Sequence, residues 1–163
     1  MSEPDTPRLG VTTTRQISVA ALSGAIIAFA VLSLGDAAGW FAPMVPWTVP
    51  AVLAVLAVVA LGYARALPRR IDQQQVSADE GVRALVIGKS MSMTGAVLAG
   101  GHVVYVAWFV NSLPAPHPAA RVVVGAVTIL MSLAVAWAGV RLERACRVND
   151  DSGEGPETPS EPA

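Results

Sequence analysis

Four long runs of mostly apolar residues constrain this chain more than any other feature of its sequence. They cover residues 17–35, 49–66, 84–110 and 122–140. A helix of about 18 or more apolar residues is long enough to cross the roughly 30 Å hydrocarbon core of a bilayer. Four such runs within 163 residues leave little chain for anything else. We therefore predict an all-α integral membrane protein that folds as a four-helix bundle.

Composition favours this interpretation over a soluble one. Hydrophobic residues make up 53% of the chain and charged residues 14%, and the mean hydropathy is +0.54. The alternative is a soluble bundle with buried helices. It would have too little polar surface to cover four runs that are apolar nearly all round. The net charge of −1 gives no indication of nucleic-acid binding, and a single cysteine, Cys146, excludes an intrachain disulfide.

The basic residues predict an orientation. Of the 11 Lys and Arg residues, only Arg121 lies beside a predicted outer loop. The others flank the opposite ends of the four runs, at Arg8, Arg15, Arg65, Arg69, Arg70, Arg83, Lys89, Arg141, Arg144 and Arg147. Because short loops rich in Lys and Arg stay in the cytoplasm, we expect a multi-pass protein of the cytoplasmic (cell) membrane with both termini inside. The alternative, that the first run is a cleaved signal peptide, conflicts with the run's length.

The remaining segments can also be assigned. Residues 1–14 and the acidic tail 149–163 are polar and expected to be disordered, so residues 15–148 form the transmembrane domain. Ser77 and Glu80 have the spacing of a capping box, which predicts a third helix starting near Ala78, after a connection over 68–76. The fourth helix is expected to end near Arg147. Aromatic rings are expected at the two membrane interfaces: Trp40, Phe41, Trp47, Tyr105, Trp108 and Phe109 outside, Tyr63 and Trp137 inside.

Small residues recur at helical spacing within the runs. In the third run they are Gly88, Ser92, Gly95 and Ala99, and in the fourth Gly125, Thr128, Ser132 and Gly139. Small faces let helix backbones approach closely, and hydroxyl groups can hydrogen-bond across. We predict that these two helices pack antiparallel; the alternative is a narrow polar path between them. In the first run, Ala21, Gly24 and Ala28 indicate either close contact or simply abundant alanine.

The polar residues of the third run and the end of the fourth are the candidate functional residues. They are Lys89, Ser90, Ser92, Thr94, His102, Glu143 and Arg144. An ionisable group at membrane depth is a functional-site hypothesis, although Lys89 could instead snorkel to the inner interface or pair with Glu143. His102 could relay protons or bind a metal. No second ligand lies within helical reach and His117 is in an outer loop, so we expect a hydrogen bond to a neighbouring helix instead.

Catalytic motifs are absent from the sequence. It contains no phosphate-binding glycine loop, nucleophile elbow or zinc-protease helix. We therefore expect no enzymatic activity, no metal and no cofactor.

Three stretches carry a family resemblance. They are Gly39-Trp40 with Val45-Pro46-Trp47, then residues 83–90 continuing to Gly100-Gly101, and finally residues 142–148. Through them the chain resembles an actinobacterial family of small four-span membrane proteins classed as a domain of unknown function. Gly88 departs mildly from that family, where alanine is common. The resemblance implies a four-helix architecture and a cytoplasmic-membrane location, and it implies no reaction.

Two functional hypotheses follow. The first is a non-enzymatic accessory or scaffold subunit that acts on a membrane protein partner through its basic cytoplasmic face. The alternative is a small transporter or lipid-binding protein that uses the polar face of the third helix. Because four helices are few for a transport path, this alternative requires a homo-oligomer. In both hypotheses the lipid bilayer surrounds the protein and nucleic acid is not a partner.

Overall fold

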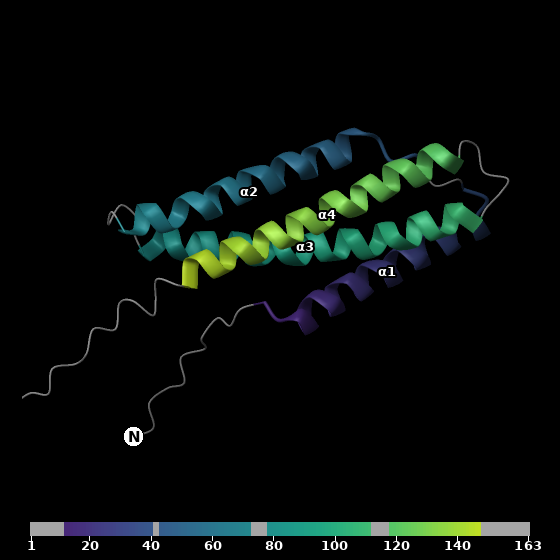
Figure 1. Ribbon diagram of the computed structural model, residues 1–163. Coiled ribbons are helices and arrows are strands. Elements are labelled where there is room, and N and C mark those ends of the chain that lie inside the picture. Colours follow the sequence, from purple (N-terminus) through teal and green to yellow (C-terminus); the bar gives the residue numbers. More distant parts are fainter. Residues whose placement is uncertain (1–11, 41–42, 73–77, 112–117, 148–163) are drawn as a thin grey trace, which may run out of the picture.

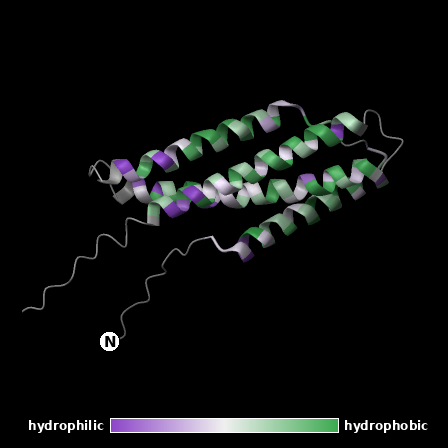
Figure 2. Cartoon of the chain, in the orientation of Figure 1, coloured by the Kyte–Doolittle hydropathy of each residue, from purple (hydrophilic) through white to green (hydrophobic). Residues whose placement is uncertain are grey.

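The computed structural model describes residues 12–40, 43–72, 78–111 and 118–147 of the chain. These residues form four α-helices: α1 (Thr14–Ala37), α2 (Thr48–Asp72), α3 (Ala78–Asn111) and α4 (Pro118–Arg147). All four are long and apolar enough to cross a membrane, as predicted, and their apolar surfaces are visible in Figure 2. The predictions for Ser77, Phe41, His117 and most of the two terminal segments lie outside the described residues.

The helices are ordered α1, α3, α4, α2 across the molecule (Figure 1). The antiparallel pair α3 and α4 lies at the centre, α1 packs against α3, and α2 packs against α4. The helix termini therefore lie at two ends of the bundle. One of these ends holds the N-termini of α1 and α3 and the C-termini of α2 and α4, and we call it the basic end. We call the other one the opposite end.

The two outer helices expose most of their apolar residues. In α1 only Gly24 and Gly35 are buried. The large exposed side chains of these helices are Val19, Leu22, Ile26, Ile27, Phe29, Val31, Leu34, Val52, Val55, Leu56, Val58 and Val59. A soluble monomer rarely exposes a continuous apolar surface of this kind, whereas a helix in lipid needs it because its side chains contact the hydrocarbon core.

Specific local sequences fix both ends of α1. Thr13 is the N-cap, and its hydroxyl and the Gln16 side chain form a reciprocal capping box. At the other end, Gly39 adopts φ +68°, its N–H donates to Asp36 at 3.0 Å, and the Trp40 N–H donates to Gly35 at 2.8 Å. These two bonds form a Schellman motif. The Gly39-Trp40 turn is therefore the C-terminal cap of α1.

Helix α2 continues further than the sequence predicted. Pro68 was assigned to a connection but lies inside α2, which ends at Asp72. A proline in the last turns removes a single helical hydrogen bond. Packing offsets this loss, because the neighbouring Leu67 is fully buried beside Ala84 of α3 and Leu142 of α4. The predicted start of the third helix at Ala78 is confirmed.

The α3–α4 interface is as close as the small residues predicted. A Cβ added to Gly95 would lie 2.6 Å from the Ser132 carbonyl oxygen, and one added to Gly139 would lie 2.5 Å from the Gly88 carbonyl oxygen. Ser92, Thr128 and Ser132 are fully buried between the two helices. The backbones at these positions leave no room for a polar path, so packing is the correct alternative.

The hydroxyl groups of Ser92, Thr128 and Ser132, which could have bonded across this interface, form no such bond among the described residues. Ser92 donates to the Lys89 carbonyl at 2.9 Å and Thr128 to the Val124 carbonyl at 2.8 Å, both within their own helix. The Ser132 hydroxyl has no hydrogen-bond partner. The reason is geometric, because a serine or threonine hydroxyl in a helix readily reaches the carbonyl three or four residues back.

The contact between α1 and α3 depends on glycine in the same way. A Cβ on Gly24 would overlap the Val97 carbonyl, and a Cβ on Gly100 would overlap the Ala21 carbonyl. The small residues of the first helix therefore mark a true helix–helix contact rather than an excess of alanine. This contact makes α1 an integral part of the fold.

Candidate functional site at the basic end

Most of the charged residues that the structure describes gather at the basic end, which is also the more hydrophilic end in Figure 2. They are Arg15, Arg65, Arg69, Glu80, Arg83, Lys89, Arg141, Glu143 and Arg144. At the opposite end the charged residues described are Asp36 and Arg121, and Arg121 is only 8% exposed. The sequence asymmetry is therefore also an asymmetry of the folded molecule.

Glu143 is the most buried ionisable residue at the basic end, with 1% of its surface exposed. Its Oε1 accepts a hydrogen bond from the backbone N–H of Thr12 at 2.6 Å. Its Oε2 is buried and has no hydrogen-bond partner. Because Thr12 precedes α1, this bond fixes the segment leading into α1 against α4, a contact that the sequence did not predict.

The pairing of Lys89 with Glu143, one of the alternatives that the sequence left open, is not among the contacts of the described residues. Lys89 is half-buried on α3 and is not among the groups bonded to the Glu143 carboxylate. The α3 residue beside Glu143 is Gly88, where an added Cβ would lie 3.1 Å from the Glu143 backbone nitrogen. Helix geometry explains the difference, since consecutive residues point about 100° apart and only one of them can face α4.

The other candidates of α3 do not converge on one site. Ser92 is buried against α4, whereas Ser90 and Thr94 are exposed. His102 Nδ1 lies 2.9 Å from the Leu98 carbonyl oxygen. This hydrogen bond is within α3, whereas the sequence had led us to expect one to a neighbouring helix. In the part of the chain that the structure describes, no group of three His, Cys, Asp or Glu residues could hold a metal ion.

Several aromatic residues assigned to the interfaces face inward instead. Tyr105 and Phe109 are buried with ring centroids 4.8 Å apart, and the Arg121 guanidinium carbon lies 4.7 Å above the Phe109 ring. At the basic end, the Tyr63 hydroxyl donates to Glu80 Oε1 at 2.8 Å and joins α2 to α3. Trp40, Trp47 and Trp137 remain exposed, as membrane-interface residues would be.

A cavity of about 350 Å³ opens between α2 and α4 at the basic end. Arg65 of α2 and Arg141 and Arg144 of α4 line it together with Trp137. The Arg141 guanidinium carbon lies 4.8 Å above the Trp137 ring. Arg144 was among the candidate residues, but its convergence with Arg65 and Arg141 was not predicted from the sequence. A signal for it was present, because Trp137, Arg141 and Arg144 are spaced to share one helix face.

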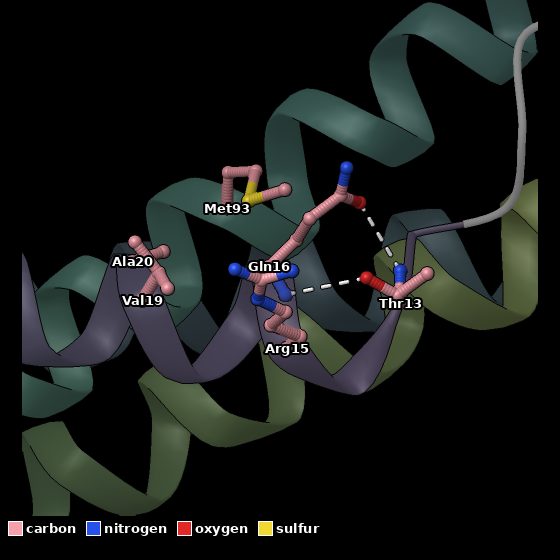
Figure 3. Close-up of a pocket in the computed structure, with 6 residues that line it drawn as sticks. All are labelled: Thr13, Arg15, Gln16, Val19, Ala20 and Met93. Atoms are coloured by element: carbon pink, nitrogen blue, oxygen red, sulfur yellow. Dashed lines mark hydrogen bonds between the residues drawn. The ribbon is translucent and has the colours of Figure 1, made fainter.

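A second cavity, of about 450 Å³, lies where α1 begins beside α3 (Figure 3). Its polar groups are largely used by the cap of α1. Thr13 N–H donates to Gln16 Oε1 at 3.1 Å, and Gln16 N–H donates to Thr13 Oγ1 at 3.3 Å. Among the described residues that line this cavity, Arg15 alone is charged. This cavity therefore offers a ligand fewer charged groups than the cavity between α2 and α4, which Arg65, Arg141 and Arg144 line and which we call the arginine-lined cavity.

Four helices that are long and apolar enough to cross a membrane, with most of the described charges at one end, are typical of the membrane-protein class. The chain belongs to the family described as "Protein of unknown function (DUF3180)", whose model matches residues 17–150. The resemblance to a domain of unknown function is thereby confirmed. No curated protein and no solved structure matches the chain.

Proposed function

We propose that the chain is a non-enzymatic accessory or scaffold subunit of an actinobacterial cytoplasmic membrane, acting on a membrane protein partner through its basic end. The observation that carries the proposal is the location of the charges. Of the charged residues described, all but Asp36 and Arg121 lie at the basic end, while the helix flanks are apolar. By the positive-inside rule this end, and with it both termini, is cytoplasmic. A protein partner would meet most of the described charges at this end and a mainly apolar surface along the helix flanks.

Orientation can be tested with the native cysteine. Cys146 is the only cysteine in the chain and lies in the last turn of α4 at the basic end. A membrane-impermeant thiol reagent should label it in inside-out vesicles and not in intact cells. A Trp40→Cys variant in a Cys146→Ala background should show the reverse pattern, because Trp40 is exposed at the opposite end. Labelling of Cys146 from outside the cell would contradict the proposed orientation.

The partner can be tested by extracting the tagged protein from its native membrane directly into lipid nanodiscs. We expect one membrane protein to co-purify in a fixed ratio to the tagged protein and to be absent from an untagged control. Charge reversal at an exposed residue of the basic end, Arg69→Glu, should reduce that ratio, whereas Val52→Leu on the lipid-facing surface should not. Recovery of the protein with no enriched partner would contradict the accessory role.

A second candidate function, a small oligomeric transporter or lipid-binding protein, has one observation in its favour. Ser90 and Thr94 are four residues apart on α3 and both are exposed, so their hydroxyls share one face. Hydroxyls on such a face can hydrogen-bond between helices in lipid. A Ser90→Val, Thr94→Val double variant should then dissociate an oligomer detected by native mass spectrometry. A wild-type protein that is strictly monomeric would exclude this candidate.

A further inference from the structure

The arginine-lined cavity between α2 and α4 has the composition of an anion site. Three arginine residues, Arg65, Arg141 and Arg144, line a volume of about 350 Å³. That volume falls within the roughly 300–1,000 Å³ typical of small-ligand sites. Among the described residues, no carboxylate lines the cavity. The nearest described acid in the α4 sequence, Glu143, is buried outside this lining and accepts a hydrogen bond from Thr12.

The helix register produces this convergence. Trp137, Arg141 and Arg144 follow one another at spacings of four and three residues, which places them on one face of α4. Leu61 and Arg65 share a face of α2 in the same way. Since α2 packs against α4, the two faces meet across the cavity. An anion between them would relieve the mutual repulsion of the three arginines.

One of the arginines is held in place. The Arg141 guanidinium carbon lies 4.8 Å above the ring of Trp137, a cation–π contact that orients its planar group. A planar guanidinium presents paired N–H donors that match two oxygens of a phosphate. Arg65 and Arg144 also line the cavity, and both are exposed.

The depth of the cavity indicates the source of the anion. The apolar runs of α2 and α4 end at residues 66 and 140, so Arg65 and Arg141 lie at the ends of those runs. That is the level of lipid headgroups. Toward the middle of the helices the cavity is lined by Leu61 and Ala64, which suit the glycerol and upper acyl groups of a lipid.

We infer that this cavity binds the phosphate headgroup of an anionic phospholipid of the leaflet at the basic end. Basic pockets between transmembrane helices are a known means of recognising such headgroups. The inference rests on the proposed membrane orientation, which assigns that leaflet to the cytoplasmic side. It names a ligand at the basic end that is separate from any protein partner.

Native mass spectrometry of the purified full chain tests the inference. The protein would be reconstituted with equimolar phosphatidylglycerol and phosphatidylcholine and then released from the nanodisc. We expect one retained phosphatidylglycerol and no retained phosphatidylcholine. Arg141→Gln should lower the retained fraction roughly tenfold, the factor expected from loss of a charge-assisted hydrogen bond. Arg141→Lys should give an intermediate fraction, because lysine keeps the charge but loses the planar fork.

Two matched variants serve as controls. Arg15→Gln and Arg69→Gln remove the same charge at the same end from residues that do not line the cavity, and they should retain lipid as the wild type does. Equal retention of both lipids, or equal loss in control and cavity variants, would overturn the inference. Displacement of the lipid by millimolar inorganic phosphate would also overturn it, because the site would then serve a soluble phosphate compound.

The lipid experiment can fail independently of the proposed function. If Cys146 is labelled from the cytoplasmic side and a protein partner co-purifies, but no lipid is retained, only the lipid inference fails. If Cys146 is labelled from outside, the accessory role on the cytoplasmic face fails whatever lipid is bound.

Discussion

Glu143 Oε1 accepts the backbone N–H of Thr12 at 2.6 Å across 131 positions of the sequence. The two residues come from the segment before α1 and from the last turns of α4. Both are more than nine-tenths buried, so the bond is shielded from water. It connects the outermost helix of one side to the central pair.

Replacing Glu143 should release this connection. In Glu143→Ala the Thr12 N–H loses its acceptor while remaining in a buried place, which costs about 1–3 kcal/mol. Hydrogen exchange should accelerate at Thr12 to Gln16 and remain unchanged in the middle of α4. Glu143→Gln keeps a carbonyl oxygen as acceptor and should preserve much of the protection. Unaltered exchange at Thr12 in the alanine variant would show that the bond does not hold this segment.

A methyl group at Gly95 should force α3 and α4 apart. The added Cβ would lie 2.6 Å from both the Ser132 carbonyl oxygen and the Ala136 nitrogen, and backbone atoms cannot turn aside. Overpacking of this kind costs about 1–3 kcal/mol, which reversible unfolding in mixed micelles would measure. Gly62→Ala is the matched control, because nothing lies within 4 Å of its added Cβ. A similar effect of both substitutions would contradict the close interface.

Gly39 should be sensitive for a different reason. No atom lies within 4 Å of a Cβ built there, but its φ is +68°. Gly39→Ala should therefore destabilise the end of α1 by about 1–2 kcal/mol through backbone strain alone, seen as faster hydrogen exchange at Ala38 and Trp40. Gly39→Asn should be milder, since asparagine tolerates this conformation better. If alanine and asparagine have the same effect, the left-handed cap is not what glycine provides here.

Some features of this fold could be predicted because they depend on local sequence and on the membrane as solvent. The apolar runs gave four helices, and glycine spacing gave the α3–α4 contact. The direction of individual side chains was less accessible. Whether Lys89 or Gly88 faces α4 depends on the rotation of α3 about its own axis. The small residues of α3 define that rotation only once α3 has been packed against α4.

The candidate site was the least predictable part. Thr12 belongs to a segment assigned to disorder, and only tertiary packing brings it to Glu143. The arginine-lined cavity joins α2 to α4, which are not consecutive in the chain. The basic residues at the helix ends therefore predicted an orientation in the membrane. The sequence did not predict that arginines from two helices would converge on one cavity.

Phe109 should stabilise Arg121 at the opposite end of the molecule. The Arg121 guanidinium carbon lies 4.7 Å above its ring, and both side chains are buried. Phe109→Leu removes the π face and keeps most of the apolar volume, so a loss of about 0.5–2 kcal/mol is expected. Phe109→Tyr keeps the ring face and should retain the contact.

Burial of Phe109 alone would also destabilise the leucine variant, so a double-mutant cycle with Arg121→Gln is needed to isolate the contact. The two substitutions should be non-additive by about the cation–π energy, whereas Val110→Leu, at an exposed neighbour of Phe109, should add independently to Arg121→Gln. Strict additivity for Phe109 would mean that Arg121 is stabilised by its other contacts. Non-additivity would mean that the Phe109 ring helps to hold the Arg121 side chain inside the fold.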